Sequence, residues 1–166
     1  MNKTKTITLS AMLAALVFIA TFFLKIPLPQ GYAHLGNCFV LISGWVLGPV
    51  YGALAAGIGS VMADVCGGFA IYIIPTFIIK ALSAIFAYLS MKFLSDKIKN
   101  KYVRRTLSAV AGGWICPAGY FIFEIFVYSF PNALLDVWAL IAEECVGIVC
   151  ALLLAAALDK TSMAIK

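Results

Sequence analysis

Charged side chains are scarce in this sequence: Asp, Glu, Lys and Arg together make up 11% of its 166 residues, whereas roughly a quarter is usual in soluble domains. Apolar residues make up 64% of the chain, and the mean hydropathy is +1.05. The core of one soluble domain of this length cannot hide so much apolar surface. The composition therefore excludes a soluble domain and predicts a single integral membrane domain over residues 1–166.

The residue types that catalytic sites need are also few. The chain has one histidine, His34, so it offers neither a histidine cluster for a metal nor a credible Ser-His-Asp set. Its five cysteines include no C-x-x-C pair, and Met62 occupies the place where Gly57-x-Gly59 would need a third glycine to bind a dinucleotide. An enzyme is therefore the least favoured class, and no metal or cofactor is expected. No ATP-binding motif is present, so active transport would draw on a partner or an ion gradient.

Long apolar runs dominate the chain instead. Six stretches can be drawn, at residues 7–24, 35–47, 50–65, 71–93, 106–128 and 133–158. Because about 20 helical residues span a bilayer core, the second and third stretches are short. Short or Gly/Pro-interrupted segments are where transporter binding sites tend to lie. The predicted fold class is all-α: a polytopic bundle of six transmembrane helices, the second and third folded back through Gly48-Pro49.

Basic residues are distributed unevenly along these stretches. If the N-terminus is cytoplasmic, six spans return the C-terminus to the cytoplasm, and ten of the twelve Lys and Arg residues fall on that side. These ten are Lys3, Lys5, Lys92, Lys97, Lys99, Lys101, Arg104, Arg105, Lys160 and Lys166. The bias satisfies the positive-inside rule and predicts that both termini are cytoplasmic. The net charge of +5 is therefore attributed to topology, with no nucleic-acid partner.

Ionisable side chains inside apolar stretches are functional hypotheses by default. Residues four apart share a helix face, which groups Tyr72, Thr76 and Lys80 on one helix and Tyr120, Glu124 and Tyr128 on another. The outer connection at residues 25–34, with two prolines and a glycine, is expected to act as a lid. The candidate substrate-binding residues are His34, Asn37, Tyr72, Thr76, Lys80, Glu124, Tyr128 and Glu143.

Two interpretations of Lys80 stay open. It forms an internal salt bridge with one glutamate, since burying a lone ion costs several kcal/mol, or it lines a ligand site. One lysine cannot balance Glu124, Glu143 and Glu144 together, so at least one acid is protonated, exposed to water or paired with something outside this chain. A polar ligand meets that need. Glu144 points about 100° away from Glu143 on a helix and stays open between ligand binding, helix packing and a water-filled crevice.

Small residues mark one face of the first apolar stretch. Ala11 and Ala15 are four residues apart, with Ala14 beside them. Small side chains at this spacing let a second helix approach closely within a membrane. The spacing alone does not decide whether that second helix belongs to this chain or to another protein.

A family resemblance lies in the central part of the chain. His34-Leu-Gly-Asn37, the run from Leu47 to Ser60, Ala63-Asp64 and Pro75-Thr-Phe-Ile-Ile-Lys80 resemble the substrate-binding S components of energy-coupling factor (ECF) vitamin transporters. The likeness extends to the chain length, the number of helices and the alanines of the first helix. It implies a vitamin-binding subunit in the plasma membrane of a bacterium, whose pocket lies under the first outer loop.

The resemblance also implies partners and a substrate class. In this family the first-helix alanines, here Ala11 and Ala15, meet a transmembrane T component that sits on two ABC ATPases. The mixed charges and aromatic residues favour a small heterocycle with hydroxyl groups: pyridoxine or hydroxymethylpyrimidine first, riboflavin second. Two other classes stay open. One is an ion-coupled carrier that uses Glu143 or Glu124 as its proton site, and the other is a membrane assembly subunit that binds no ligand.

Overall fold

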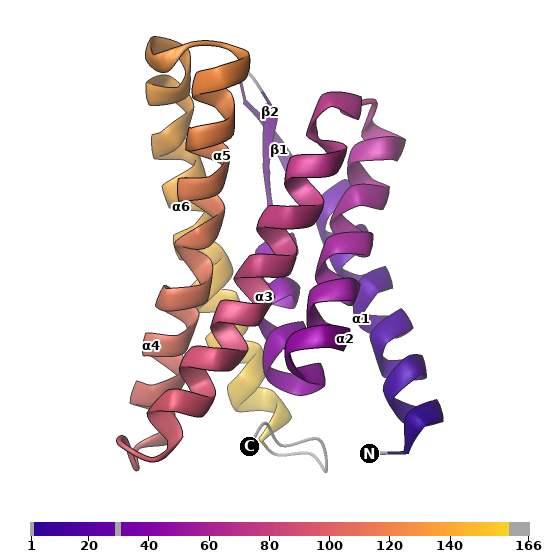
Figure 1. Ribbon diagram of the computed structural model, residues 1–166, viewed down its shortest axis with the longest axis vertical. Coiled ribbons are helices and arrows are strands. Elements are labelled where there is room, and N and C mark those ends of the chain that lie inside the picture. The colour runs from indigo at the N-terminus through magenta and orange to yellow at the C-terminus, as the bar shows by residue number, and fades with distance from the viewer. Residues whose placement is uncertain (1, 29–30, 160–166) are drawn as a thin grey trace.

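The structure is a computed structural model that describes residues 2–28 and 31–159 (Figure 1). In chain order its elements are α1 (Lys3–Phe22), β1 (Lys25–Leu28), β2 (Gly31–His34), α2 (Gly36–Gly67), the 3-10 turn η1 (Ala70–Tyr72), α3 (Ile73–Ser95), α4 (Lys101–Gly113), α5 (Ile115–Val127) and α6 (Phe130–Leu158). The helices run along the long axis of the molecule, and the strands lie toward its upper end. The beginning of α1 and the end of α6 both lie at the lower end.

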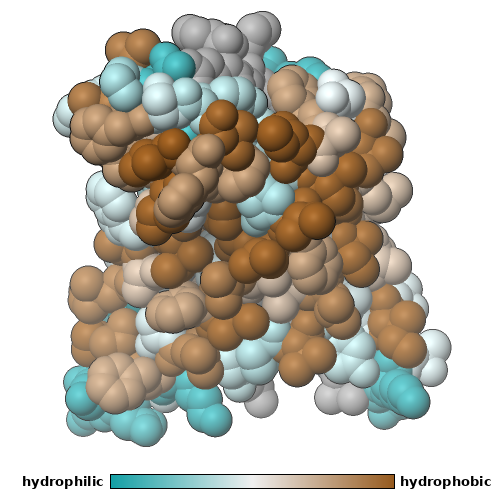
Figure 2. All heavy atoms as spheres, turned by 45° about the horizontal axis from the view of Figure 1, so that its top comes forward, coloured by the Kyte–Doolittle hydropathy of each residue, from teal (hydrophilic) through white to brown (hydrophobic). Residues whose placement is uncertain are grey.

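Five helical segments among the described residues are long and apolar enough to cross a membrane. They are Lys3–Phe22, Gly36–Gly67, Ala70–Ser95, Lys101–Val127 and Phe130–Leu158. Large apolar side chains point outward from them; Ile74 and Leu135, for example, are 72% and 73% exposed. Figure 2 shows a mostly apolar surface, with the most hydrophilic side chains toward its upper and lower edges. Such a surface is compatible with the hydrocarbon core of a membrane, in which helices satisfy their own backbone hydrogen bonds.

Helix α2 is two antiparallel arms joined by a turn at Gly48. Gly48 has φ +81° and ψ −173°, a conformation that glycine adopts without the steric cost of a Cβ, and Pro49 cannot continue the hydrogen-bonding pattern of the first arm. Across the turn, Ser43 Oγ donates to the Gly52 carbonyl oxygen at 3.2 Å. Residues nine apart in a straight helix would lie about 13 Å apart, so the chain reverses here. The predicted stretches 35–47 and 50–65 correspond to the two arms.

The predicted helix at residues 106–128 corresponds to one apolar helical segment, Lys101–Val127. The helical segment begins earlier, at Lys101, and is interrupted at Trp114 between α4 and α5. Pro117 explains the interruption, because it has no N–H to donate to the carbonyl of Gly113 and its ring crowds the preceding turn. The other boundaries move by a few residues: α1 starts at Lys3 and α6 at Phe130.

The all-α prediction needs one correction, at the connection between α1 and α2. Strands β1 and β2 form an antiparallel hairpin there, with Lys25 opposite His34 and Leu28 opposite Gly31. The sequence predicted an irregular lid at this place. Backbone N–H and C=O groups near a membrane need hydrogen-bond partners, and strand pairing supplies them within the connection itself.

Small residues bring the helices into close contact. A Cβ on Gly44 would collide with the backbone of Ala84, and one on Gly112 would lie 2.7 Å from the Ala87 Cβ. Next to these contacts, Trp45 Nε1 donates to Ser108 Oγ at 2.8 Å, and Ser108 Oγ donates to the Ala87 carbonyl at 2.6 Å. The first arm of α2, α3 and α4 are therefore tied together in the lower half of the bundle.

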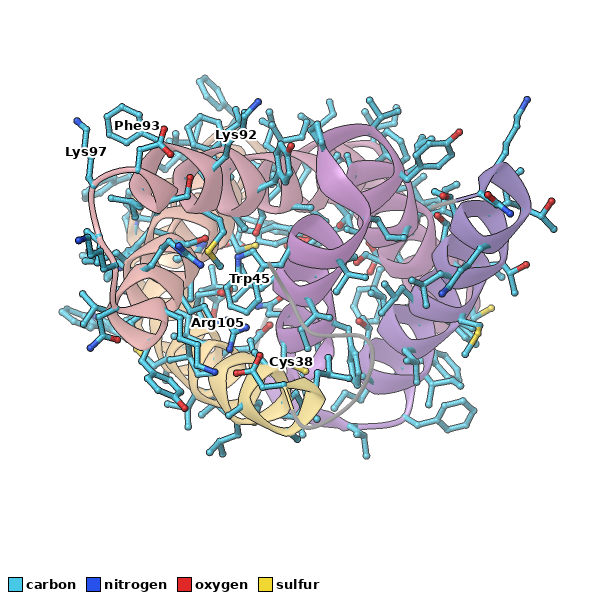
Figure 3. All side chains as sticks on the ribbon, turned by 90° about the horizontal axis from the view of Figure 1, so that it is seen from below. Cys38, Trp45, Lys92, Phe93, Lys97 and Arg105 are labelled. Carbon is cyan, nitrogen blue, oxygen red and sulfur yellow. The ribbon has the colours of Figure 1, made fainter. Side chains whose placement is uncertain are left out.

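The lower end of the bundle carries exposed basic side chains. Viewed from below, Lys92 and Lys97 extend from its edge while Arg105 points toward the interior (Figure 3). Lys97 Nζ lies 4.0 Å from the centroid of the Phe93 ring. Arg105 donates through both terminal nitrogens to the two carboxylate oxygens of Asp159 at 2.7 Å, which joins the start of α4 to the end of α6.

Candidate functional site

A cluster of buried polar side chains lies beside the hairpin, where the start of α2 meets α3, α5 and α6. Asn37, Lys80, Glu143 and Glu144 are 2%, 1%, 8% and 3% exposed. Lys80 is the largest side chain in the described part of the molecule that is fully buried. Charged groups this deep in an apolar bundle are costly unless they have polar partners, so their mutual geometry determines what the cluster can do.

The amide of Asn37 is the centre of this cluster. Lys80 Nζ donates to its Oδ1 at 2.6 Å. Its Nδ2 donates to Glu143 Oε1 at 2.8 Å and to Glu144 Oε2 at 2.7 Å. Because an ammonium only donates and a carboxylate only accepts, these partners fix which side of the amide carries the oxygen. Gly147 leaves room for this arrangement, since a Cβ there would lie 2.9 Å from the Asn37 Cβ.

Lys80 makes its remaining contacts with uncharged groups. Its Nζ lies 3.7 Å from Cys116 Sγ and 5.1 Å from the centroid of the Tyr120 ring, a cation–π distance. Within the described part of the chain it forms no direct salt bridge with a glutamate. The salt-bridge interpretation of Lys80 is therefore replaced by a link through the neutral amide of Asn37.

His34 closes the cluster from the end of β2. Its Nδ1 accepts a hydrogen bond from the Gly36 N–H at 3.0 Å and lies 3.4 Å from Glu143 Oε1. Burial lowers the pKa of His34 well below its ordinary value of 6.5, and the positive charge of Lys80 lowers it further. At neutral pH the imidazole is therefore uncharged, and its Nδ1 is an acceptor.

A second polar layer lies closer to the upper end of the bundle. Tyr72 donates to Glu124 Oε1 at 3.3 Å, and Tyr120 donates to Thr76 Oγ1 at 3.0 Å. The Tyr72 ring packs against those of Tyr120 and Phe123, with centroids 6.2 Å and 5.3 Å away. Through the Tyr120 ring this aromatic layer contacts the ammonium of Lys80.

The predicted site residues thus separate into groups. His34, Asn37, Lys80 and Glu143 come together in the cluster. Tyr72, Thr76 and Glu124 belong to the aromatic layer. Tyr128 lies at the edge of that layer and is 38% exposed.

The cluster also contains residues outside the predicted set of substrate-binding residues. Glu144 reaches Asn37 as closely as Glu143 does, although helical periodicity directs the two side chains apart. Cys116 and Tyr120 contact Lys80 from α5. Tyr120 shares a helix face with Glu124, which was the one available signal; nothing in the sequence marks Cys116 among five similar cysteines.

The two alanines of α1 lie on a different face of the molecule from the cluster. Ala11 and Ala15 are exposed, whereas Leu13 and Val17 are buried. The internal contact of α1 uses Ala14, whose carbonyl oxygen a Cβ on Gly59 would strike. The predicted partner-binding pair therefore remains available on the outer face of α1.

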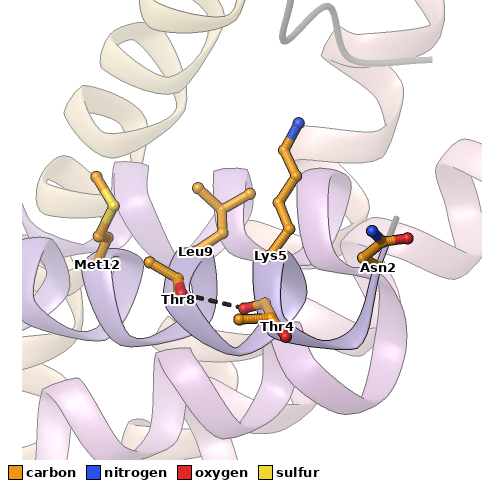
Figure 4. A pocket seen from close by; sticks show the side chains of 6 residues that line it. All are labelled: Asn2, Thr4, Lys5, Thr8, Leu9 and Met12. Atoms are coloured by element: carbon orange, nitrogen blue, oxygen red, sulfur yellow. Dashed lines mark hydrogen bonds between the residues drawn. The ribbon is translucent and has the colours of Figure 1, made fainter.

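Two hollows flank α1 in the lower half of the bundle, well away from Asn37. The larger, about 530 Å³, is open and lies along the first turns of α1 (Figure 4). The smaller, about 180 Å³, is an apolar groove between α1, α2 and α6 that includes Leu13, Ile42 and Leu154. Neither gathers convergent polar groups of the kind that orient a water-soluble ligand.

The fold and the cluster define a helical membrane protein with a set of buried polar side chains in its hairpin half and with exposed small residues on α1. A family model described as "ECF-type riboflavin transporter, S component" matches residues 1–160. The chain therefore belongs to this family, and the predicted resemblance to ECF S components is confirmed. The family is one of transporter subunits, and the chain is accordingly a membrane protein.

Two individual proteins are also similar to this chain. The fold is similar to that of a crystal structure of the S component for biotin from an ECF-type ABC transporter, with a TM-score of 0.76, 21% sequence identity, and 96% of this chain and 93% of that chain covered. An uncharacterised protein of Pyrococcus woesei, described as lying in the gap 3′ region, is 28% identical over 135 residues, which are 80% of this chain and 87% of that protein. The first similarity concerns the fold alone, and neither assigns a substrate to this chain.

Proposed function

We propose that this protein is the substrate-binding S component of an ECF-type ABC importer. It binds a small water-soluble vitamin or vitamin precursor on the outer side of the membrane and delivers it inward together with an ATPase-driven energising module. The observation that carries this proposal is the cluster around Asn37, in which Lys80, Glu143 and Glu144 meet beside the hairpin. A purely structural subunit would have no need for so many buried ionisable groups in one place.

The proposed topology has six membrane segments, with the two arms of α2 counted separately, and both termini in the cytoplasm. The exposed basic side chains at the lower end of the bundle support it, because Lys and Arg are enriched on the cytoplasmic side. The hairpin then faces outward, where a ligand arrives. The proposed location is the plasma membrane of a bacterium.

The proposed binding residues are those of the cluster and of the aromatic layer. His34, Asn37, Lys80 and Glu143 supply hydrogen bonds, and Tyr72, Thr76, Glu124 and Tyr128 form the outward wall. A ring stacked on the aromatic layer with hydroxyl groups directed at the cluster fits this distribution. Pyridoxine or hydroxymethylpyrimidine is the proposed substrate and riboflavin the second candidate.

The proposed partners are a transmembrane T component and two ABC ATPases. The exposure of Ala11 and Ala15 supports a helix contact from outside this chain, because small side chains allow close approach and packing drives helix association in lipid.

Native mass spectrometry of the detergent-purified protein tests the proposed function. One vitamin molecule bound per chain, released and identified, is the expected result. A titration panel of pyridoxine, hydroxymethylpyrimidine, riboflavin and biotin covers the case in which the protein is purified empty. Transport by the protein alone in proteoliposomes, driven by a proton gradient, would instead establish the ion-coupled carrier. Failure to bind any vitamin would favour the assembly subunit.

A further inference from the structure

Acidic side chains are concentrated in the interior of this protein. Five of its seven Asp and Glu residues are buried, each 8% exposed or less, and all five lie in the middle or hairpin half of the bundle. These five are Asp64, Glu124, Asp136, Glu143 and Glu144. Two basic side chains in the described residues are similarly buried, Lys80 and Arg105, and Arg105 lies at the other end of the bundle on Asp159. The interior around the cluster therefore has more carboxyl groups than cations.

The hydrogen bonds show the same excess. One amide nitrogen, Asn37 Nδ2, serves both Glu143 and Glu144. Glu144 Oε1 is buried without a hydrogen-bond partner, and so is Glu124 Oε2. The backbone at Gly113 leaves room for the first of these oxygens, since a Cβ there would lie 2.6 Å from it. A buried acceptor without a donor costs about 1–3 kcal/mol and more when charged.

A metal ion does not account for this arrangement. Among residues 2–28 and 31–159, no three His, Cys, Asp or Glu side chains are placed to hold a metal ion together. The lysine is not available to the carboxylates either, because its ammonium is held by Asn37, Cys116 and the Tyr120 ring. An organic ligand that carries hydrogen-bond donors would complete these acceptors.

We infer that the site selects a heterocycle that is cationic or rich in hydrogen-bond donors and rejects one that carries a carboxylate, and that Glu143 and Glu144 make this distinction. The inference rests on the proposed function and narrows its substrate class. An amine or hydroxyl group supplies the hydrogen bond that Glu144 Oε1 lacks and adds a donor where Glu143 and Glu144 share one amide nitrogen, whereas a carboxylate brings further acceptors and a like charge. Like charges brought together at a binding site cost several kcal/mol.

Ligands matched in shape and different in charge test the inference. Isothermal titration calorimetry on the full chain in detergent at pH 7 compares pyridoxamine, pyridoxine and 4-pyridoxate, which share one pyridine ring and differ in one substituent. Riboflavin and biotin extend the comparison to a neutral, donor-rich vitamin and a carboxylate vitamin. The amine or the alcohol is expected to bind at least about 100-fold more tightly than the carboxylate, since each tenfold corresponds to about 1.4 kcal/mol.

Substitutions identify the residues responsible. Glu143→Gln and Glu144→Gln keep the size of the side chain and remove its charge. Each is expected to weaken binding of the preferred ligand about 10- to 100-fold and to reduce the discrimination against 4-pyridoxate. Asp96→Asn, at the exposed end of α3, removes an acid outside the site and is the matched control; it should change neither value.

The outcomes separate the inference from the proposed function. Equal or tighter binding of 4-pyridoxate or biotin, or unchanged discrimination in both glutamine variants, overturns the inference and leaves a vitamin-binding subunit. If riboflavin is the one vitamin that binds, the effect of Glu144→Gln decides. Weaker riboflavin binding in this variant supports the inference, and unchanged riboflavin binding contradicts it. Failure of every vitamin to bind overturns the proposed function and the inference with it.

Discussion

At the lower end of the bundle, charged groups pair directly with groups of opposite sign, whether they are exposed, as Lys101 is, or buried, as Arg105 is. Asp159 accepts hydrogen bonds from both Lys101 and Arg105. In the hairpin half, Lys80 meets Glu143 and Glu144 only through the neutral amide of Asn37. Exposed pairs contribute about 1 kcal/mol or less, whereas removing one partner of a buried pair costs about 3–5 kcal/mol.

This difference distinguishes charges that fix topology from charges that serve a site. The lower end needs its positive charge to stay cytoplasmic, and almost any arrangement of lysines satisfies that requirement. The cluster needs a particular geometry, because each buried group depends on the next. Matched substitutions in the two regions test this difference.

The largest effect is expected from Asn37→Leu. It removes the group that joins Lys80 to both glutamates, so the free energy of unfolding should fall by about 3–5 kcal/mol and vitamin binding should be lost. Thermal unfolding in detergent and calorimetry measure the two effects. The matched variant is Asn100→Ala: Asn100 caps α4 at the exposed end, and the loss of a cap costs about 1 kcal/mol. Similar losses in both variants would mean that the two regions do not differ.

The sequence predicted the members of the cluster better than their connections. The spacing of Thr76 and Lys80 placed both on one face of α3, and Tyr72 precedes them in the turn η1. The turn at Gly48-Pro49 could also be predicted, because glycine and proline determine backbone conformation locally. The break at Trp114 was missed although Pro117 is a visible signal for it.

Long-range geometry was beyond the sequence. Glu143 and Glu144 point apart by about 100° on a helix, yet both reach Asn37 because its Nδ2 lies between them. That position depends on the packing of α2 against Gly147 of α6, more than 100 residues further along the chain. The hairpin was missed for a similar reason: strand pairing depends on neighbouring structure more than on intrinsic preference.

The next largest effect is expected from Lys80→Met. The variant keeps an unbranched side chain of similar length but leaves the interior acids without a cation, so ligand affinity should fall about 100-fold, as for loss of a desolvated charge. The matched variant Lys101→Met removes a lysine from the pair with Asp159 and should leave affinity unchanged. Calorimetry on both proteins makes the comparison. Unchanged affinity in Lys80→Met would limit that lysine to a structural role.

The two regions should also differ in how their stability depends on pH, and this effect is smaller than that of Lys80→Met. The unfolded chain protonates His34 near pH 6.5, whereas burial lowers the pKa of His34 in the folded chain. The unfolded state then binds more protons, so the contribution of His34 to stability is full above about pH 6.5 and falls as the pH drops below it. Hydrogen bonds from Arg105 and Lys101 lower the pKa of Asp159, so its contribution is present above about pH 3.9 and is lost below that value.

Thermal unfolding between pH 4.5 and 7.5 covers the range in which the contribution of His34 changes. His34→Gln should flatten the pH dependence in this range, whereas Asp159→Asn should lower stability evenly across this range and leave its pH dependence unchanged, removing only the dependence seen below about pH 3.9. A slope that survives in His34→Gln would assign the titration to another buried group.

The smallest effect on the isolated protein is expected from Ala11→Leu and Ala15→Leu. Both side chains are exposed, so a larger residue meets lipid, and neither unfolding temperature nor vitamin affinity should change measurably.

Gly59→Leu, on the second arm of α2, is the opposite case. Its side chain would strike α1 near Ala14 and Val17, and this overpacking should destabilise the protein by about 1–3 kcal/mol. If α1 contacts the T component through these alanines, uptake by the reconstituted complex should be lost in the alanine variants although binding is intact. Retained uptake would move the partner contact to another face, whereas lost binding would show that the alanines support the cluster from a distance.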